Sequence, residues 1–86
     1  MPEISRFFGI IIRMFFGDHL PPHFHAHYGK HRAQVSIESL TVLRGSLPPR
    51  AMGLVIEWAA LHQAELRGAW ELAVHSKPVQ PIEPLK

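Results

Sequence analysis

The chain has 86 residues, of which 47% are hydrophobic and 19% are charged, and its formal net charge is +2 at pH 7. This length suits one domain, and the balance of apolar and charged residues is that of a globular chain. It contains no cysteine, which excludes disulfides and thiolate metal sites. Its nine Lys and Arg residues are scattered, so a nucleic-acid-binding module is poorly supported, although RNA stays open as a partner.

The beginning of the sequence bears on location. Residues 1–5 lack the charged and apolar regions of a signal peptide. The apolar stretch at residues 7–16 is interrupted by Arg13 and is too short for a membrane-spanning helix. Together with the lack of cysteine, this predicts a cytoplasmic protein that does not associate with a membrane.

The first apolar stretch is expected to be a strand. Residues 8–16 are rich in β-branched and aromatic side chains. Residues 17–22, which end in consecutive prolines, are expected to form a loop. Alternation along the strand predicts one core-facing set of side chains, namely Phe8, Ile10, Ile12, Met14 and Phe16.

The next two strands are expected to form a hairpin. Residues 23–28 alternate strictly and residues 32–37 alternate again, on either side of a turn at Gly29. Phe24, Ala26 and Tyr28 share the side that suits a core. A short strand at residues 41–44 follows and completes a sheet of three to four antiparallel strands.

The second half is expected to be helical. Pro48 and Pro49 suit the first turn of a helix, and the following residues are apolar almost all round, including Leu61. One helix from Pro49 to His75 would be about 40 Å long, which is too long for a domain of this size. A break is therefore expected near residues 62–64.

The chain is thus predicted to be an α+β protein in which a three- to four-stranded antiparallel sheet is followed by two helices packed on one face. Residues 1–75 are expected to form a single domain. Residues 76–86 are expected to form an extended, proline-containing tail.

Strand alternation also predicts an open sheet face away from the helices. This face would carry the three histidines of residues 23–28 beside a candidate partner-binding surface of Ile11, Arg13, Phe15 and Gln34. Alternatively, the tail or a second copy of the chain covers it, which would make the protein a homo-oligomer in the second case.

The strongest chemical signal lies in residues 18–27. Alternate residues of a strand project from the same face about 6.6 Å apart, so their imidazoles can converge on one ion. Ligands of this kind without cysteine suit zinc or another divalent transition metal, such as nickel, iron or manganese. The candidate ligands are Asp18, His19, His23, His25 and His27.

Two other interpretations of the same residues stay open. The histidines could act as general acid and base without a metal, with Arg13 or Arg32 stabilising a phosphate, as in a small ribonuclease. They could also be half-exposed strand residues that are hydrogen-bonded to their neighbours.

Several segments together resemble the bacterial domain-of-unknown-function 4160 family. They are residues 1–7, the end of the first strand at Arg13-Met14, the Pro-Pro-His-Phe-His-Ala block at 21–26, Leu-Pro-Pro-Arg-Ala at 47–51, Glu-Trp-Ala at 57–59 and Ile-Glu-Pro-Leu at 82–85. In many relatives an acidic residue is expected in place of His27, which favours a His/His/carboxylate set over three histidines.

The resemblance implies a small prokaryotic protein of a family without an established activity. It also implies a co-encoded partner, a small protein of the domain-of-unknown-function 2442 family, in an arrangement similar to a toxin–antitoxin pair. The leading hypothesis is therefore a partner-binding component of such a two-protein module. The alternative is a histidine-based or metal-dependent hydrolase or nuclease centred on His23 and His25.

Overall fold

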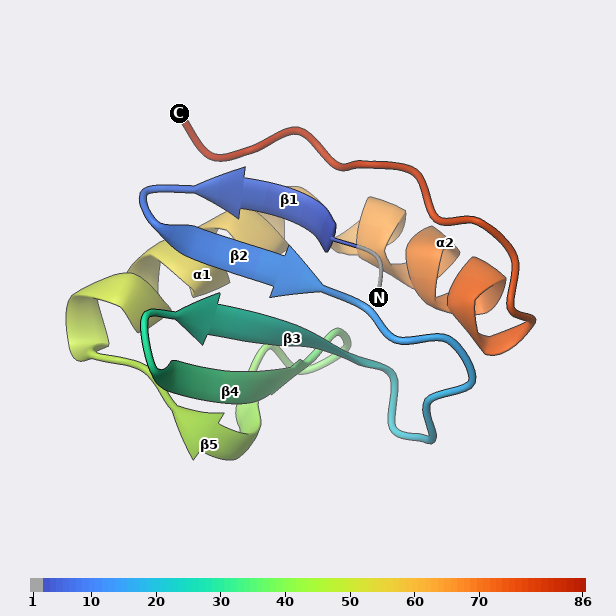
Figure 1. Cartoon of the computed structure of the whole chain (residues 1–86), viewed down its shortest axis with the longest axis horizontal. Helices are drawn as coiled ribbons and strands as arrows, with labels where there is room; N and C mark the ends of the chain where they lie inside the picture. The colour runs from blue at the N-terminus through green and yellow to red at the C-terminus, as the bar shows by residue number, and fades with distance from the viewer. Residues whose placement is uncertain (1–2) are drawn as a thin grey trace.

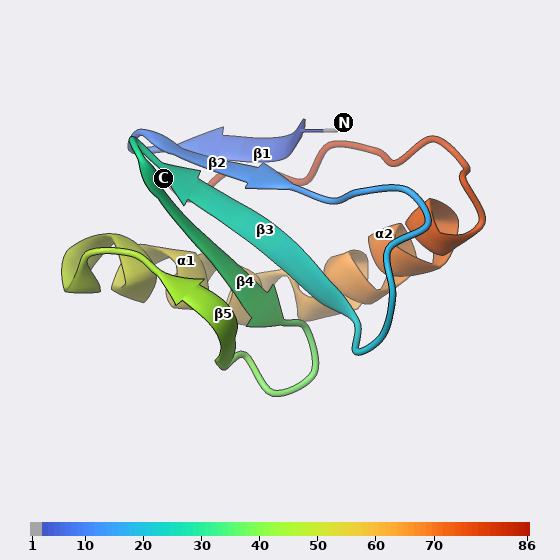
Figure 2. The ribbon, with the colours of Figure 1, turned by 60° about the horizontal axis from the view of Figure 1, so that its bottom comes forward.

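The computed structural model describes residues 3–86, in which an antiparallel sheet is followed by two helices (Figure 1). Five strands follow one another in the sheet in chain order. They are β1 (Glu3–Phe7), β2 (Ile10–Arg13), β3 (His23–Tyr28), β4 (His31–Ser36) and β5 (Val42–Ser46). The helices are α1 (Pro49–Leu61) and α2 (Gln63–Val74), which lie on one side of the sheet (Figure 2). The α+β prediction is confirmed, as is the break between the helices.

The additional strand lies where none was expected. The chain reverses at Phe8 and Gly9, both of which have positive φ (49° and 80°), so β1 pairs with β2. The predicted strand at residues 8–16 was therefore too long at both ends. Phe8 and Phe16 are 59% and 49% exposed and do not belong to the core face, because both lie beyond β2.

The core lies between the sheet and the helices. The fully buried Trp58 of α1 packs against Phe7 and Phe24, with ring centroids 5.4 and 5.8 Å apart. Two residues expected in the core are exposed instead. Tyr28 stands at the β3–β4 turn, and Leu61 ends α1 on its outer side with 67% of its surface exposed.

The last residues pack against the domain. Residues 77–86 contain neither helix nor strand and run beside β1 (Figure 1). The backbone N–H of Ile82 donates to the carbonyl oxygen of Ile4 at 2.7 Å, and Trp58 Nε1–H donates to the carbonyl oxygen of Glu83 at 2.8 Å. Ile82 is itself buried, so this segment contributes to the core.

Among the helices described in residues 3–86, none has the length and apolar character needed to cross a membrane.

Candidate metal centre

The centre begins with the loop between β2 and β3, which backbone hydrogen bonds fix near both of its ends. Gly17 N–H donates to the carbonyl oxygen of Ala73 in α2 at 3.0 Å, and Pro22 accepts from Ile37 N–H at 3.0 Å. The loop is thus attached to α2 on one side and to the chain that follows β4 on the other. This attachment places Asp18 in front of the first residues of β3.

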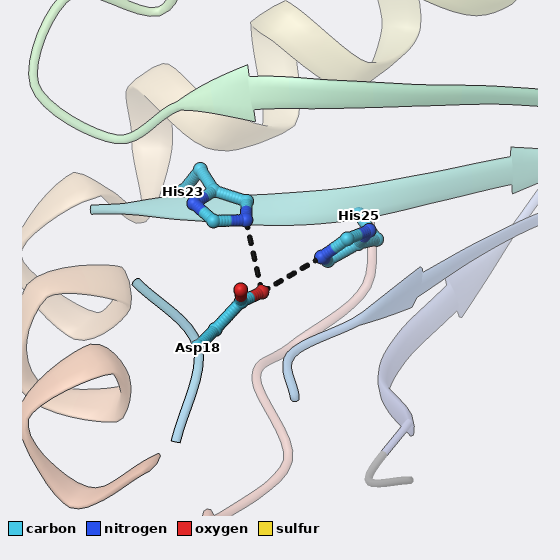
Figure 3. Close-up of side chains that lie close together, drawn as sticks. All are labelled: Asp18, His23 and His25. Carbon is cyan, nitrogen blue, oxygen red and sulfur yellow. Dashed lines mark hydrogen bonds and ion pairs between the residues drawn. The ribbon is translucent and has the colours of Figure 1, made fainter. Parts of the chain in front are cut away.

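Asp18, His23 and His25 converge on one point (Figure 3). Nε2 of His23 lies 2.9 Å from Oδ2 of Asp18, and Nε2 of His25 lies 3.1 Å from the same oxygen. One ligand atom from each residue falls within 4.8 Å of the other two. Two imidazole nitrogens and a carboxylate oxygen at this spacing can bind one divalent transition metal ion.

The ring orientation of His23 is set by the backbone. Its Nδ1 lies 2.8 Å from the carbonyl oxygen of Pro21, which can only accept, so Nδ1 carries a proton. In the neutral ring, Nε2 then presents a lone pair to a carboxylate oxygen. That contact is favourable only if the ring is an imidazolium or if a cation is shared between the two atoms. A ligating histidine whose other nitrogen donates to a carbonyl is the usual arrangement at protein metal sites.

His23 is buried, so its Nε2 atom cannot be left without a partner at low cost in free energy. The residue is only 4% exposed, and its ring packs 5.4 Å from that of Trp70 in α2. The expectation that His23 lies on an open face was therefore wrong, since α2 covers the start of β3. A buried polar nitrogen needs a partner, and Asp18 or an ion held by Asp18 supplies it.

The protonation of the other two residues suits metal binding. Burial of Asp18 disfavours its charged form. This cost is outweighed by hydrogen bonds from His25 and from the backbone N–H of His19, and by the charges of His23 and His25. The pKa of Asp18 therefore lies below its ordinary value. Burial also lowers the pKa of His25, against the opposing hydrogen bond to Asp18. A carboxylate and a neutral imidazole are the forms that bind metals.

Two of the candidate ligands do not join the cluster. The side chain of His19 is 94% exposed, with Nδ1 3.5 Å from Oδ1 of Asp18, the oxygen turned away from the other histidines. His27 lies two residues beyond His25 on β3 and pairs with Ile11 and Arg32 on the neighbouring strands. Burial lowers its pKa, and the nearby positive charges of Arg13 and Arg32 lower it further.

A polar row continues from His25 across the sheet. Arg13 of β2 pairs with His25, which pairs with Gln34 of β4, which in turn pairs with Arg44 of β5. Directly paired residues project from the same face of a sheet. Of the predicted partner-binding residues, Arg13 and Gln34 therefore stand in the row, and Phe15 packs on His25 with ring centroids 4.1 Å apart. Ile11 belongs to the next row, beside His27.

Two of the hollows beside the three converging side chains share residues of the polar row. One, of about 260 Å³, is bordered by Asp18 and His23; the other, of about 370 Å³, is bordered by His25 and His27. Gln34 and Arg44 border both. Arg44 was not among the residues singled out from the sequence. Its place depends on an irregularity between β4 and β5, where Gln34 faces Arg44 but Val35 faces Val42.

Comparison with known proteins gives one match. Residues 9–71, which include all three converging side chains, match the model of a family described as a domain of unknown function (DUF4160). The searches of curated proteins and of solved structures return no match. Because the family model spans well over half of the sequence, the chain belongs to the DUF4160 family.

Proposed function

We propose that this protein is a metal-dependent hydrolase whose ion is bound by Asp18, His23 and His25. The observation that carries the proposal is the convergence of the two Nε2 atoms on Oδ2 of Asp18, with Nδ1 of His23 held by a backbone carbonyl. A shared cation relieves the contact between lone pairs that a neutral His23 would otherwise make. Zinc or another divalent transition metal fits these donors.

Three protein ligands support a catalytic site more than a structural one. Structural zinc sites are usually closed by four protein ligands, whereas catalytic sites keep a position for water or substrate. The hollow beside Asp18 and His23 gives access to that position, and Arg44 and Gln34 supply polar groups at its border. In the hydrolysis, water adds to the electrophilic centre, the bond to the leaving oxygen breaks, and the proton lost by water ends on that oxygen.

The first prediction concerns metal affinity. Zinc, nickel or manganese should raise the melting temperature of the wild-type protein, because a ligand that binds only the native state stabilises it. Asp18→Asn, which keeps the shape but removes the charge, should abolish the shift, as should His25→Gln. His27→Gln is the matched control on the same strand and should behave as wild type.

The pH dependence of this effect has a definite sign. Acid protonates the imidazole ligands, so metal binding should be present at pH 7 and be lost below the ordinary histidine range, about pH 6.5. The lowered pKa values of His25 and Asp18 keep both groups in their binding forms to lower pH than free side chains. Differential scanning fluorimetry with each metal at several pH values measures this. Equal shifts in wild type and Asp18→Asn would refute the site.

Hydrolysis is tested on the same variants with chromogenic esters. The proposal expects turnover that a chelator removes and that the metal restores. Turnover that survives chelation but is lost in His25→Gln would instead support the histidine-based hydrolase, in which Asp18 orients His25 as general base.

A second candidate function is binding of a protein partner in a toxin–antitoxin-like module, with the co-encoded protein of the domain-of-unknown-function 2442 family as the expected partner. The observation that favours it is β5, which is exposed at every position and includes the apolar side chains of Val42 and Leu43. An exposed edge strand can pair with a strand from another chain. Co-purification of the two proteins, compared with a Leu43→Lys variant that places a charge on the exposed edge strand, tests this function.

A further inference from the structure

The hollow beside His25 has an unusual charge distribution. Among its lining residues are Arg32, Gln34 and Arg44, whereas no Asp or Glu lines it. Arg44 projects from the same face as Gln34, and Arg32 from the same face as His27, because each pair is directly opposed in the sheet. The hollow is therefore a groove with an arginine from each of two adjacent strands.

Arg32 and Arg44 lack the ion pairs that hold two other surface arginines. Arg6 and Arg67 are held by Glu3 and Glu38 in two-point hydrogen-bonded ion pairs. Within residues 3–86, the guanidinium groups of Arg32 and Arg44 form neither an ion pair nor a side-chain hydrogen bond. Their donors are thus available to an anionic ligand.

We propose that this groove binds the phosphate group of a phosphate ester, and that the ester is the substrate of the adjoining metal centre. Guanidinium groups match phosphate oxygens in charge and geometry. A volume of about 370 Å³ is at the lower end of small-molecule pockets. Arg44 also borders the hollow that is lined by Asp18 and His23, so the groove adjoins the metal centre. In its catalytic part this inference rests on the proposed hydrolase.

The reaction follows from these placements. Water adds to phosphorus, the bond between phosphorus and the leaving alcohol oxygen breaks, and the proton released by water is transferred to that oxygen. Arg44 and Arg32 neutralise the charge on the oxygens that do not react. Electrostatic stabilisation of this kind is the main protein contribution to phosphoryl transfer.

Binding is the decisive measurement, because it does not require turnover. The probes are AMP and a fluorescein-labelled single-stranded RNA hexamer, each titrated with and without metal at about 0.15 M salt, where the Debye length is about 8 Å. Arg44→Gln and Arg32→Gln should each weaken binding at least about tenfold, since each removes a charge-assisted hydrogen-bond donor. Arg50→Gln is the matched control, because Arg50 is exposed and borders a different hollow.

The two probes separate the sources of phosphate. Full competition by AMP identifies a mononucleotide-sized ester, whereas binding of the hexamer alone identifies a strand. Wild-type affinity in Arg44→Gln, or an equal loss in Arg50→Gln, would overturn the phosphate site.

A third substrate distinguishes failure of this inference from failure of the hydrolase. Metal-dependent hydrolysis of 4-nitrophenyl acetate without binding of either phosphate probe would leave the hydrolase standing and overturn the groove. Binding of a phosphate probe that depends on Arg44, in a protein that binds no metal, would support the groove and remove the metal-dependent hydrolase.

Discussion

Two buried serines, in β1 and β4, differ in whether their hydroxyl groups have a hydrogen-bond partner, and this difference bears on the stability of the fold. Ser5 and Ser36 are 7% and 6% exposed. Oγ of Ser36 accepts from the backbone N–H of Ser39 at 3.2 Å, whereas Oγ of Ser5 has no hydrogen-bond partner within the described chain. An unpaired buried hydroxyl costs about 1–3 kcal/mol.

Ser5→Ala should therefore raise the free energy of unfolding by about 1 kcal/mol, because it removes a buried polar group that has no partner. Ser36→Ala should lower it by a similar amount, because it removes the hydrogen bond between Ser36 Oγ and the N–H of Ser39. Urea denaturation of both variants beside the wild type measures the two changes. A loss of stability in Ser5→Ala would show that its hydroxyl is satisfied in solution.

The convergence of the site residues could be predicted from the sequence only in part. His23 and His25 follow from the period of two in β3, which puts them on one side with their rings 5.0 Å apart. His27 shares this side by the same period, but it lies about 6.6 Å further along the strand than His25 and does not join the cluster. Asp18 lies in a loop whose position depends on the bond from Gly17 to Ala73, which no local pattern encodes.

At the scale of elements, the alignment of β5 depends on one glycine. Gly45 has a φ of +79°, and a Cβ placed on it would lie 2.2 Å from the carbonyl oxygen of Arg32 on β4. Gly45→Ala should therefore push β5 away from β4 and displace Arg44. We expect reduced stability and weaker phosphate binding, with zinc affinity preserved because β5 supplies no ligand.

Gly29→Ala is the matched control for this prediction. Gly29 also has a positive φ, +57°, but a Cβ there meets nothing within 4 Å. It should cost only the backbone strain, about 1–2 kcal/mol, and leave phosphate affinity unchanged. Thermal denaturation and AMP titration of both variants give the comparison. Equal behaviour of the two glycines would show that contact with Arg32 does not set the position of β5.

The strands differ in how well they can be predicted from the sequence. The β3–β4 hairpin was predictable because strict alternation flanks a Gly29-Lys30 turn. β1 was not, because its register shifts between Glu3 and Ser5 and so breaks the alternation. Its turn also places an aromatic residue, Phe8, at positive φ, a conformation that favours glycine or asparagine.

For the molecule as a whole, the tail is expected to contribute to stability. A chain ending at Lys77 loses the burial of Ile82 and its bond to Ile4, and it leaves Nε1 of Trp58 without its acceptor. Burying an isoleucine contributes about 1.5–3 kcal/mol and each hydrogen bond about 0.5–1.5 kcal/mol. The truncation should thus lower the free energy of unfolding by about 2.5–6 kcal/mol in urea denaturation.

Glu83→Ala provides the control for this truncation. Trp58 donates to the backbone carbonyl of residue 83, so loss of the glutamate side chain should change stability by no more than about 0.5 kcal/mol. If the truncated chain were as stable as the full one, the packing of residues 78–86 would contribute nothing to the free energy of unfolding.

The two edge strands of the sheet differ in exposure, and this limits how copies of the molecule can pair through their edges. The tail contacts the outer side of β1 through Ile82, whereas β5 is exposed along its whole length and has no outer neighbour within residues 3–86. A chain with two free edges can polymerise by strand pairing, but a chain with one cannot. A second copy that adds through its own β5 would therefore close a pair, in which neither molecule keeps a free β5 edge for a third chain to extend.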